Sequence, residues 1–371
     1  MTKSARLAPV TPAKPSLDLL RSLTDEHVLR ALLAERQLTR AQIAARTGIS
    51  KPAVGDSVAR LAEAGLLRDT GERTTGRGRV GTYYALADDL GTALMVSIAH
   101  DGAVAEAVDV FGEVLARDVE DLGRPVRPRK VAQALRKAAA QVADEAGPLR
   151  LAVVSAADPV DRATGKLVHL PDSPFLLGEL SPADVLAPLV AGPVTVDNDV
   201  NWAARTERAA DDFAYLFLGE GLGCAVVADG EVRRGHAGFA GEIAHVLTRG
   251  PDGRAMAFID VFADLGVRQP DSTTIDVAAL RTALASDTVR ATLADAICGV
   301  LLALVTVSDP ELIVLGGPWG PDVLDAVSDR FARLPRNVPL RAPHATDSPA
   351  LTGARDEAVR ALRSAVLTVS S

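Results

Sequence analysis

The chain has 371 residues, more than one compact domain usually holds, so two or three domains are expected. The chain has only two cysteines, Cys224 and Cys298, which argues against a disulfide framework or a cysteine-based zinc site. We find no signal segment and no apolar run long enough to span a bilayer. We therefore expect a cytoplasmic protein. The net charge of −8 divides into +6 over residues 1–86 and −14 over residues 87–371, so only the N-terminal part is expected to meet a polyanion such as DNA.

The chain begins with a segment that has no periodic pattern. Residues 1–19 are rich in proline and lysine, which is typical of a flexible arm. The pattern then becomes helical, because residues 25–35 place valine and leucine on one stripe. We expect the first compact domain, residues 20–88, to begin with this helix.

A helix-turn-helix is predicted next. Thr39 is a good N-cap, and Gln42 three residues later completes a capping box. Gly48 supplies a tight turn, and Ser50 caps a second helix with Pro52 in its first turn. Two capped helices around a glycine turn indicate a helix-turn-helix.

Two strand-like runs, residues 66–69 and 82–86, then flank a stretch of arginines and glycines. This pattern predicts the wing of a winged helix, and DNA binding is favoured over the alternative, a protein-docking module. Lys51 and Arg60 suit phosphate contacts better than base contacts. A small module binds DNA weakly alone, so we expect a homodimer or tetramer on an inverted-repeat operator of double-stranded DNA. The candidate DNA contacts are Ser50, Lys51, Ala53, Ser57, Arg60, Arg73, Arg77 and Arg79.

The remainder of the chain alternates strand-like and helix-like segments, which favours an α/β fold with helix-covered sheets. Within it, Asn198 and Asp199 follow an apolar strand and open a helix. They can serve as ligands of a polar molecule, but asparagine and aspartate also cap helices well, so capping alone is the alternative. The glycine-rich turn at residues 219–223 suits either a phosphate loop or a tight hairpin.

Four stretches together resemble the ROK family (repressors, open reading frames, kinases): VDNDVNWAART, FLGEGLGCAVVADGEVRRGHAGFAGEIAHV, DPELIVLGG and ALTGARDEAV. The resemblance covers about residues 20–370. It implies a winged helix-turn-helix followed by a two-lobed, actin-like ATPase body. The first lobe would comprise residues 89–200, with 355–371 returning to it, and the second residues 201–354.

The resemblance also implies a sugar pocket. The positions that match the family's sugar ligands are Asn198, Asp199, Glu242 and His245, and Asp260 looks like the counterpart of a further carboxylate. Such a set suits a polyol, because carboxylates accept hydrogen bonds from hydroxyls while asparagine and histidine can donate or accept. In a kinase of the family, Asp199 would be the base.

Several positions depart from the pattern of the family's kinases. Ser97 stands where a phosphate-loop aspartate belongs, Ala99 replaces a glycine, Glu220 replaces a threonine, and Asp158 replaces a glycine. Carboxylates near phosphates repel them. The family's cysteine cluster after His245 is also missing, so no metal is expected, and residues 246–262 must be held by packing.

These features predict a transcriptional regulator, a repressor, that senses a sugar or sugar derivative without phosphorylating it and uses no cofactor. Two alternatives stay open. One is a sugar kinase with residual ATP-dependent activity, and the other is a DNA-binding dimer whose effector pocket is a relic.

Overall fold

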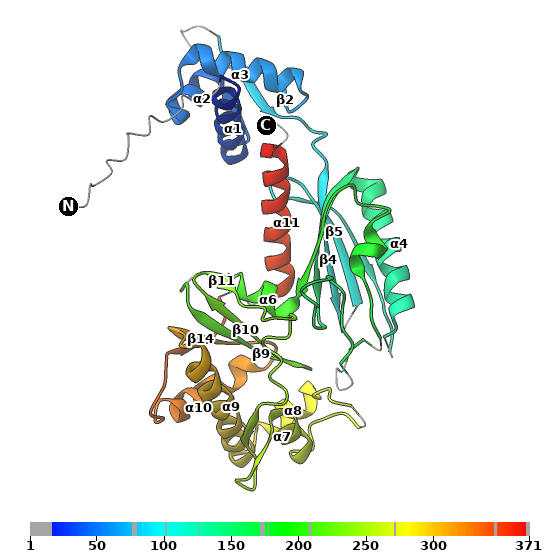
Figure 1. Ribbon diagram of the computed structural model, residues 1–371, viewed down its shortest axis with the longest axis vertical. Helices are drawn as coiled ribbons and strands as arrows, with labels where there is room; N and C mark the ends of the chain where they lie inside the picture. The colour runs from blue at the N-terminus through cyan, green and yellow to red at the C-terminus, as the bar shows by residue number, and fades with distance from the viewer. Residues whose placement is uncertain are drawn as a thin grey trace, which may run out of the picture. The chain divides into compact units, whose positions relative to one another are not determined.

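The computed structural model describes residues 17–75, 80–100, 102–124, 126–170, 175–176, 178–207, 210–270, 272–344 and 347–368 (Figure 1). The chain divides into two compact units, one of Met1–Gly91 with Ala361–Ser371 and one of Thr92–Arg360. The last helix, α11 (Pro349–Thr368), therefore contributes residues to both units. The expected lobes, residues 89–200 with 355–371 and residues 201–354, are subdivisions that this two-unit division does not resolve, and they stay predictions.

The N-terminal unit is a winged helix-turn-helix. Its strands pair antiparallel in the order β1-β3-β2, so the hairpin β2–β3 is joined by a short third strand that the sequence pattern did not indicate. Val28, Leu32, Ile43, Val54 and Val58 are fully buried in its core. The elements are α1 (Leu17–Glu35), β1 (Gln37–Thr39), α2 (Arg40–Thr47), α3 (Lys51–Glu63), β2 (Leu67–Arg73) and β3 (Thr82–Leu86).

The capping residues of this unit are confirmed. The Thr39 hydroxyl accepts from the backbone N–H of Gln42, and the Gln42 side chain accepts from the backbone N–H of Thr39 at 2.8 Å. Gly48 ends α2 with φ of 71°, a left-handed conformation that costs glycine little. Ser50 caps α3 by accepting from the N–H of Ala53.

The second unit contains two five-stranded mixed sheets, which confirm the expected two-lobed α/β class. The first sheet has the order β6-β5-β4-β7-β8, with β7 and β8 parallel to β4. The amphipathic helix α4 packs Val131, Leu135 and Val142 into the same core as this sheet. The elements are β4 (Thr92–Ala99), β5 (Gly102–Val108), β6 (Val114–Glu120), α4 (Pro128–Ala146), β7 (Leu149–Ala156), α5 (Pro182–Leu186) and β8 (Val194–Asn198).

The second sheet has the order β11-β10-β9-β14-β15 and packs against α9 and α7 through a core that includes Trp319 and Phe262. A two-stranded hairpin, β12–β13, precedes α7. The strands are β9 (Phe213–Leu218), β10 (Leu222–Ala228), β11 (Glu231–Val232), β12 (Leu247–Arg249), β13 (Ala255–Ala257), β14 (Leu312–Gly316) and β15 (Leu340–Arg341). The helices are α6 (Asp199–Ala204), α7 (Phe258–Asp264), α8 (Val277–Ala283), α9 (Asp287–Ser308) and α10 (Gly320–Phe331).

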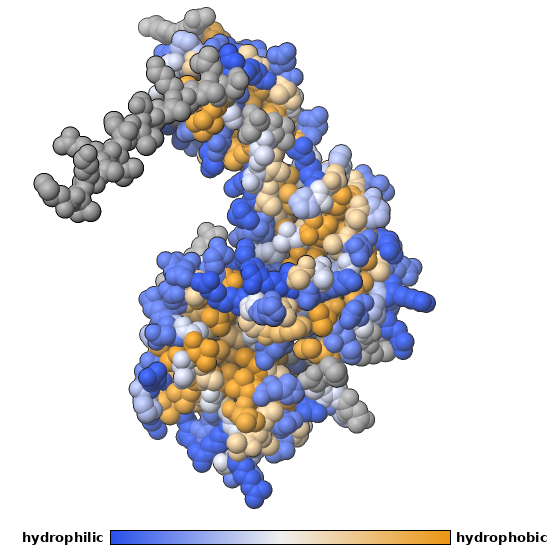
Figure 2. Space-filling view, viewed as in Figure 1, coloured by the Kyte–Doolittle hydropathy of each residue, from blue (hydrophilic) through white to orange (hydrophobic). Residues whose placement is uncertain are grey.

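Helix α9 has 22 residues, although the sequence was expected to contain no apolar run long enough to span a bilayer. By length and composition alone, this helix is apolar enough to cross a bilayer. Leu293, Ile297 and Leu301 are nevertheless fully buried within the core of the second sheet. Figure 2 shows hydrophobic residues gathered in the region where Figure 1 places α9 and α10. Core packing accounts for the apolar residues on the buried face of the helix, whereas Val307 near its C-terminal end is 87% exposed.

Candidate functional site

A cavity of about 430 Å³ lies within the second unit. Its wall is built from the junction of β8 with α6, the turn between β9 and β10, the segment around residues 157–159, and the loop at residues 238–245. Asn198, Asp199, Glu242 and His245 all line it. The structure therefore brings together four of the five predicted sugar ligands.

Asn198 has a structural role as well as a place in the cavity wall. Its side-chain oxygen accepts from the N–H of Val200 at 2.9 Å and caps α6. Its amide nitrogen donates to the carbonyls of Ala156 and Asp158 at 3.4 and 3.3 Å. These bonds tie the start of α6 to the end of β7, so the capping role that the sequence suggested exists alongside cavity lining.

The Asp199 side chain is half-buried in this wall, and one of its oxygens accepts from the N–H of Val200 at 2.7 Å. Burial raises its pKa to about 7, and repulsion from Asp158 and Glu242 acts in the same direction. The hydrogen bond from Val200 opposes this shift. Near neutral pH the carboxyl group can therefore bind as either a donor or an acceptor.

Glu242 and His245 are held at the cavity by glycines that allow close backbone approach. A Cβ on Gly241, whose φ is 104°, would lie 1.8 Å from the carbonyl oxygen of Cys224. The N–H of Cys224 donates to the carbonyl of Gly241 at 2.9 Å, which fastens the loop to β10. The close approach of Gly241 to β10 places Glu242 beside the cavity.

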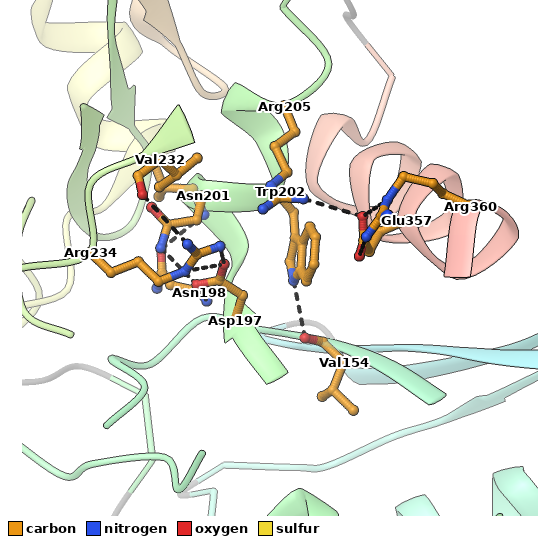
Figure 3. Close-up of polar contacts among 11 residues, drawn as sticks. Val154, Asp197, Asn198, Asn201, Trp202, Arg205, Val232, Arg234, Glu357 and Arg360 are labelled. Atoms are coloured by element: carbon orange, nitrogen blue, oxygen red, sulfur yellow. Dashed lines mark hydrogen bonds and ion pairs between the residues drawn. The ribbon is translucent and has the colours of Figure 1, made fainter. Parts of the chain in front are cut away.

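A polar network surrounds the buried Asp197 and includes the cavity-lining residues Asn198 and Asn201 (Figure 3). One Asp197 oxygen accepts from the side chain of Asn201 at 2.7 Å and from the N–H of Asn198 at 2.9 Å. The other accepts from Arg234 Nε and Nη2 at 2.9 and 2.5 Å. Asp197 is 4% exposed, so the guanidinium of Arg234 compensates a buried charge. The network joins the β8–α6 junction to the segment after β11, and it was not anticipated from the sequence.

Asp260 is the fifth predicted sugar ligand, and it does not line this cavity. Helix α7 buries Phe258, Ile259, Val261 and Phe262, so the position between these pairs faces outward. The Asp260 carboxylate is about half exposed and lies 3.4 Å from Arg268 Nη1. Asp260 therefore does not line the cavity with the other four, and its role as a sugar ligand stays a prediction.

The structure describes the positions at which the sequence departs from the phosphate loops of the family's kinases. Ala99 and Glu220 line the cavity, and Ser97 lies within β4. Glu220 forms an ion pair with Arg124 at 3.2 Å, and Arg124 also lines the cavity. The carboxylate that the sequence places in this turn therefore has a cationic partner, which sequence reasoning missed because the two residues are 96 positions apart.

Among the side chains of the described residues, no group of three or more histidine, cysteine, aspartate or glutamate residues is arranged to hold a metal ion. The segment after His245 is instead held by packing, as expected. Phe258, Ile259 and Phe262 are buried in the core of the second sheet, with Met256 packed against it. Phe262 lies 5.4 Å from Phe258 and 5.7 Å from Trp319, measured between ring centroids.

The candidate DNA contacts near α3 differ in exposure. Ser50 and Lys51 are exposed at the start of α3, and Ala53 is half-buried. Ser57 is fully buried and donates to Asp25 at 2.5 Å, so its place among the DNA contacts is wrong. Its neighbours Val54, Val58 and Leu61 form the buried face of α3, and position 57 belongs to the same face.

The arginines of this unit are partly engaged within the fold. Arg60 pairs with the buried Asp25 at 2.6 Å, a partner that sequence reasoning missed. Arg73 pairs with Asp69 at 2.9 Å, and both side chains are exposed. Arg77 and Arg79 lie outside the described residues.

Comparisons with known proteins agree with this architecture. The ROK family profile matches residues 105–355, and a profile of the MarR family matches residues 23–78. The chain is 22% identical over 237 residues to the xylose repressor of Caldicellulosiruptor bescii, covering 61% of this chain and 59% of that protein.

Solved structures share the fold. One is a ROK family transcriptional regulator described as a homolog of the E. coli MLC protein, with a TM-score of 0.64, 16% identity, and coverage of 95% of this chain and 98% of the other. A ROK family glucokinase from Streptomyces griseus, in complex with glucose and AMPPNP, gives a TM-score of 0.54 at 22% identity over 72% of this chain and 99% of that one. Because the family profile covers more than half of its length, the chain belongs to the ROK family.

Proposed function

We propose that this chain is a DNA-binding transcriptional regulator, a repressor, whose second unit binds a sugar or sugar derivative without phosphorylating it. One observation carries the proposal. The chain combines a winged helix-turn-helix with a cavity lined by Asn198, Asp199, Glu242 and His245. The first feature serves DNA recognition, and the second suits a small polar ligand.

The relatives support both halves of the proposal. The xylose repressor and the ROK transcriptional regulator carry names that describe gene regulation, and the glucokinase structure holds glucose. The chain spans 59% of the xylose repressor's length, so gene regulation by this chain is our proposal and is not taken over from that protein's name.

The four shared ligands have the chemistry that a polyol needs. Glu242 and ionised Asp199 accept hydrogen bonds from hydroxyl groups, while protonated Asp199 can donate one. His245 supplies a ring nitrogen at the exposed edge of the same wall. Ile259 and Leu222 line other parts of the cavity and suit the apolar face of a sugar ring.

Phosphoryl transfer is disfavoured by the charge on the side where a nucleotide would bind. A phosphoryl donor needs cationic groups and Mg²⁺ around its phosphates. In this chain the glycine turn carries the carboxylate of Glu220. Arg124 forms an ion pair with Glu220, so this cation is already neutralised. Ser97 stands where the family's kinases carry an aspartate. We therefore assign no cofactor and no catalytic residue.

DNA binding would use the exposed start of α3 and the wing. Ser50 and Lys51 are exposed there, and Arg73 can exchange its surface partner for a phosphate at little cost. A homodimer or tetramer in the cytoplasm would place two such modules on an inverted repeat. The ligand would bind one conformation of the second unit more tightly than another. This difference in affinity would change the fraction of molecules whose conformation is compatible with operator binding.

One observation favours the kinase as a second candidate. The pKa of Asp199 is raised to about 7, and a general base works best when its pKa lies near the operating pH. Asp199 would then deprotonate a sugar hydroxyl if a phosphoryl donor were aligned with it.

Calorimetric titration of the full chain with a panel of sugars and sugar phosphates, with and without Mg-ATP, separates the candidates. We expect saturable binding of a sugar that Asp199→Ala abolishes and that Mg-ATP leaves unchanged. Continuous heat from ATP turnover would establish the kinase. Absence of binding across the panel would leave a relic pocket and contradict sugar sensing.

A further inference from the structure

The cavity is larger than one sugar ring needs. Its volume is about 430 Å³. A hexose that is packed as densely as a protein interior fills about 200 Å³, so a single ring would leave about half of the cavity to water. Sites for small molecules bury most of the surface of their ligands. The volume therefore suits a ligand that is longer than a monosaccharide.

One wall of the cavity continues beyond the ligand residues at the start of α6. Val200 follows Asp199 and packs against β10, because a Cβ on Gly223 would lie 2.9 Å from Val200 Cγ2. Gly223 pairs with Phe217 of β9, and a Cβ on Gly219 would lie 2.6 Å from Cε1 of the Phe217 ring. The wall thus runs from Asp199 to the glycine turn between β9 and β10.

This wall is long enough for a second ring. Gly221 and Pro318 line the cavity at the turn, and a Cβ on Gly219 would lie 3.3 Å from Pro318 Cδ. From Gly223 to Gly221 the chain advances two residues, about 7 Å in an extended strand, which exceeds the width of a pyranose ring. We call the region bounded by Phe217, Gly221 and Pro318 the outer part of the cavity.

The outer part offers an apolar surface beside a polar pair. Phe217 is half-buried, and its aromatic ring and Pro318 suit the C–H face of a sugar. Arg124 and Glu220 also line the cavity and pair at 3.2 Å, with side chains that are 54% and 36% exposed. A guanidinium carries five N–H donors and a carboxylate has several acceptor positions, so the pair can also bond to hydroxyl groups.

We propose that the outer part is a second sugar subsite and that the ligand of this chain is a neutral disaccharide. One ring would bind the four ligands at residues 198, 199, 242 and 245. The second ring would pack on Phe217 and Pro318, with hydroxyl groups on the Arg124–Glu220 pair. This inference rests on the proposed sugar-binding function and names the ligand class of that same site. It places a neutral ring where the Glu220 carboxylate disfavours a nucleotide.

The experiment is calorimetric titration of the full chain with monosaccharides and their disaccharides. D-glucose is compared with maltose, cellobiose, isomaltose and gentiobiose, and D-xylose with xylobiose, so that the ring and the linkage both vary. We expect at least one disaccharide to bind about tenfold or more tightly than its monosaccharide, because the second ring adds buried contacts. Mg-ATP added to the complex should not displace the disaccharide.

Two glycine variants locate the second ring. A Cβ on Gly221 would meet no atom of the described residues within 4 Å beyond its chain neighbours, and its φ is not left-handed. Gly221→Leu therefore fills free space at the outer part without backbone strain. It should reduce the affinity for the disaccharide to that for the monosaccharide, and the affinity for the monosaccharide should stay unchanged.

Gly55→Leu is the matched control for this variant. A Cβ on Gly55 of α3 would likewise meet nothing among the described residues within 4 Å, and Gly55 does not line the cavity. Both affinities should stay unchanged in this control.

The outcomes separate this inference from the proposed function. A monosaccharide that binds as tightly as each of its disaccharides would overturn the second subsite while sugar sensing stands. Displacement of the disaccharide by Mg-ATP, or an affinity ratio that Gly221→Leu leaves unchanged, would overturn it as well. If no sugar of the panel binds, the proposed sugar function itself fails.

Discussion

Asp197 shows how one buried carboxylate organises the candidate site. It accepts from Asn201, from the backbone of Asn198 and from Arg234 (Figure 3). Each bond fixes a different segment, because Asn201 lies on α6, Asn198 ends β8, and Arg234 follows β11. The network holds Asn198 and Asp199 in place although Asp197 does not line the cavity.

Two adjacent arginines provide a matched test of this role. Arg234 pairs with buried Asp197, whereas Arg233 pairs with Asp229, which is 86% exposed. We predict that Arg234→Ala lowers the free energy of unfolding by about 3 kcal/mol, because it leaves a buried charge without its partner. Arg233→Ala should lower it by about 0.5 kcal/mol or less. Urea unfolding of both variants measures the difference, and equal effects would contradict the role assigned to Asp197.

The raised pKa of Asp199 predicts a specific pH dependence. The pKa is about 7 in the folded chain and ordinarily 3.8, so the folded state binds the extra proton between these values. The contribution of Asp199 to stability therefore falls as the pH rises from about 4 to about 7 and stays low above that.

Asp199→Asn removes this penalty. The unfolding free energy of the variant, measured relative to that of the parent, should therefore rise by about 3 kcal/mol from pH 5 to pH 8. The parent loses stability over about two pH units in this range, at about 1.4 kcal/mol per unit. Urea unfolding of both proteins at the two pH values provides the measurement. A difference that does not change with pH would show that Asp199 ionises at an ordinary pKa.

At the scale of elements, two glycines inside helices have opposite environments. A Cβ on Gly353 of α11 would lie 2.0 Å from the carbonyl oxygen of Trp202, so α11 packs on the backbone at the end of α6. A Cβ on Gly55 of α3 would meet nothing within 4 Å. The first glycine permits a close helix contact, and the second weakens its helix without any contact in return.

We predict opposite signs for the two alanine substitutions. Gly353→Ala should destabilise its unit by about 1–3 kcal/mol, because backbone must move to make room. Gly55→Ala should stabilise the winged helix by up to about 1 kcal/mol. Thermal unfolding followed by circular dichroism tests both. Stabilisation by Gly353→Ala would contradict the close packing of α11.

Helix α3 also separates DNA contact from core packing. Lys51→Ala should weaken binding to duplex DNA of any sequence and reduce the slope of log affinity against log salt by about 1. Ser57→Ala should leave that slope unchanged and reduce stability by about 1 kcal/mol, because it removes a buried hydrogen bond to Asp25. Fluorescence anisotropy with labelled duplex across a salt series distinguishes them. A reduced slope for Ser57→Ala would restore it as a contact.

These cases show what the sequence could predict. The caps at Thr39 and Ser50 are local, so short motifs sufficed. Ser57 was misplaced although helical periodicity carried the signal, since position 57 falls on the buried stripe of α3. The pairs Asp197–Arg234 and Arg124–Glu220 join distant positions, and no local pattern reveals them.

At the scale of the whole molecule, one chain combines a winged helix-turn-helix with a unit that contains the candidate ligand cavity. The alternation of strands and helices predicted an α/β fold and the family resemblance predicted two lobes, and the second unit contains two five-stranded mixed sheets. Regulation requires that ligand binding and DNA binding influence each other, and this influence must be equal in both directions.

The most direct test of this claim measures binding of the full chain to an operator duplex, selected from random sequence, with and without the sugar found by calorimetry. The account predicts that saturating sugar weakens operator affinity by about fivefold or more, and that operator weakens sugar affinity by the same factor. The Asp199→Ala variant should bind the operator normally and lose the response. Operator affinity that is identical with and without bound sugar would contradict a sensor.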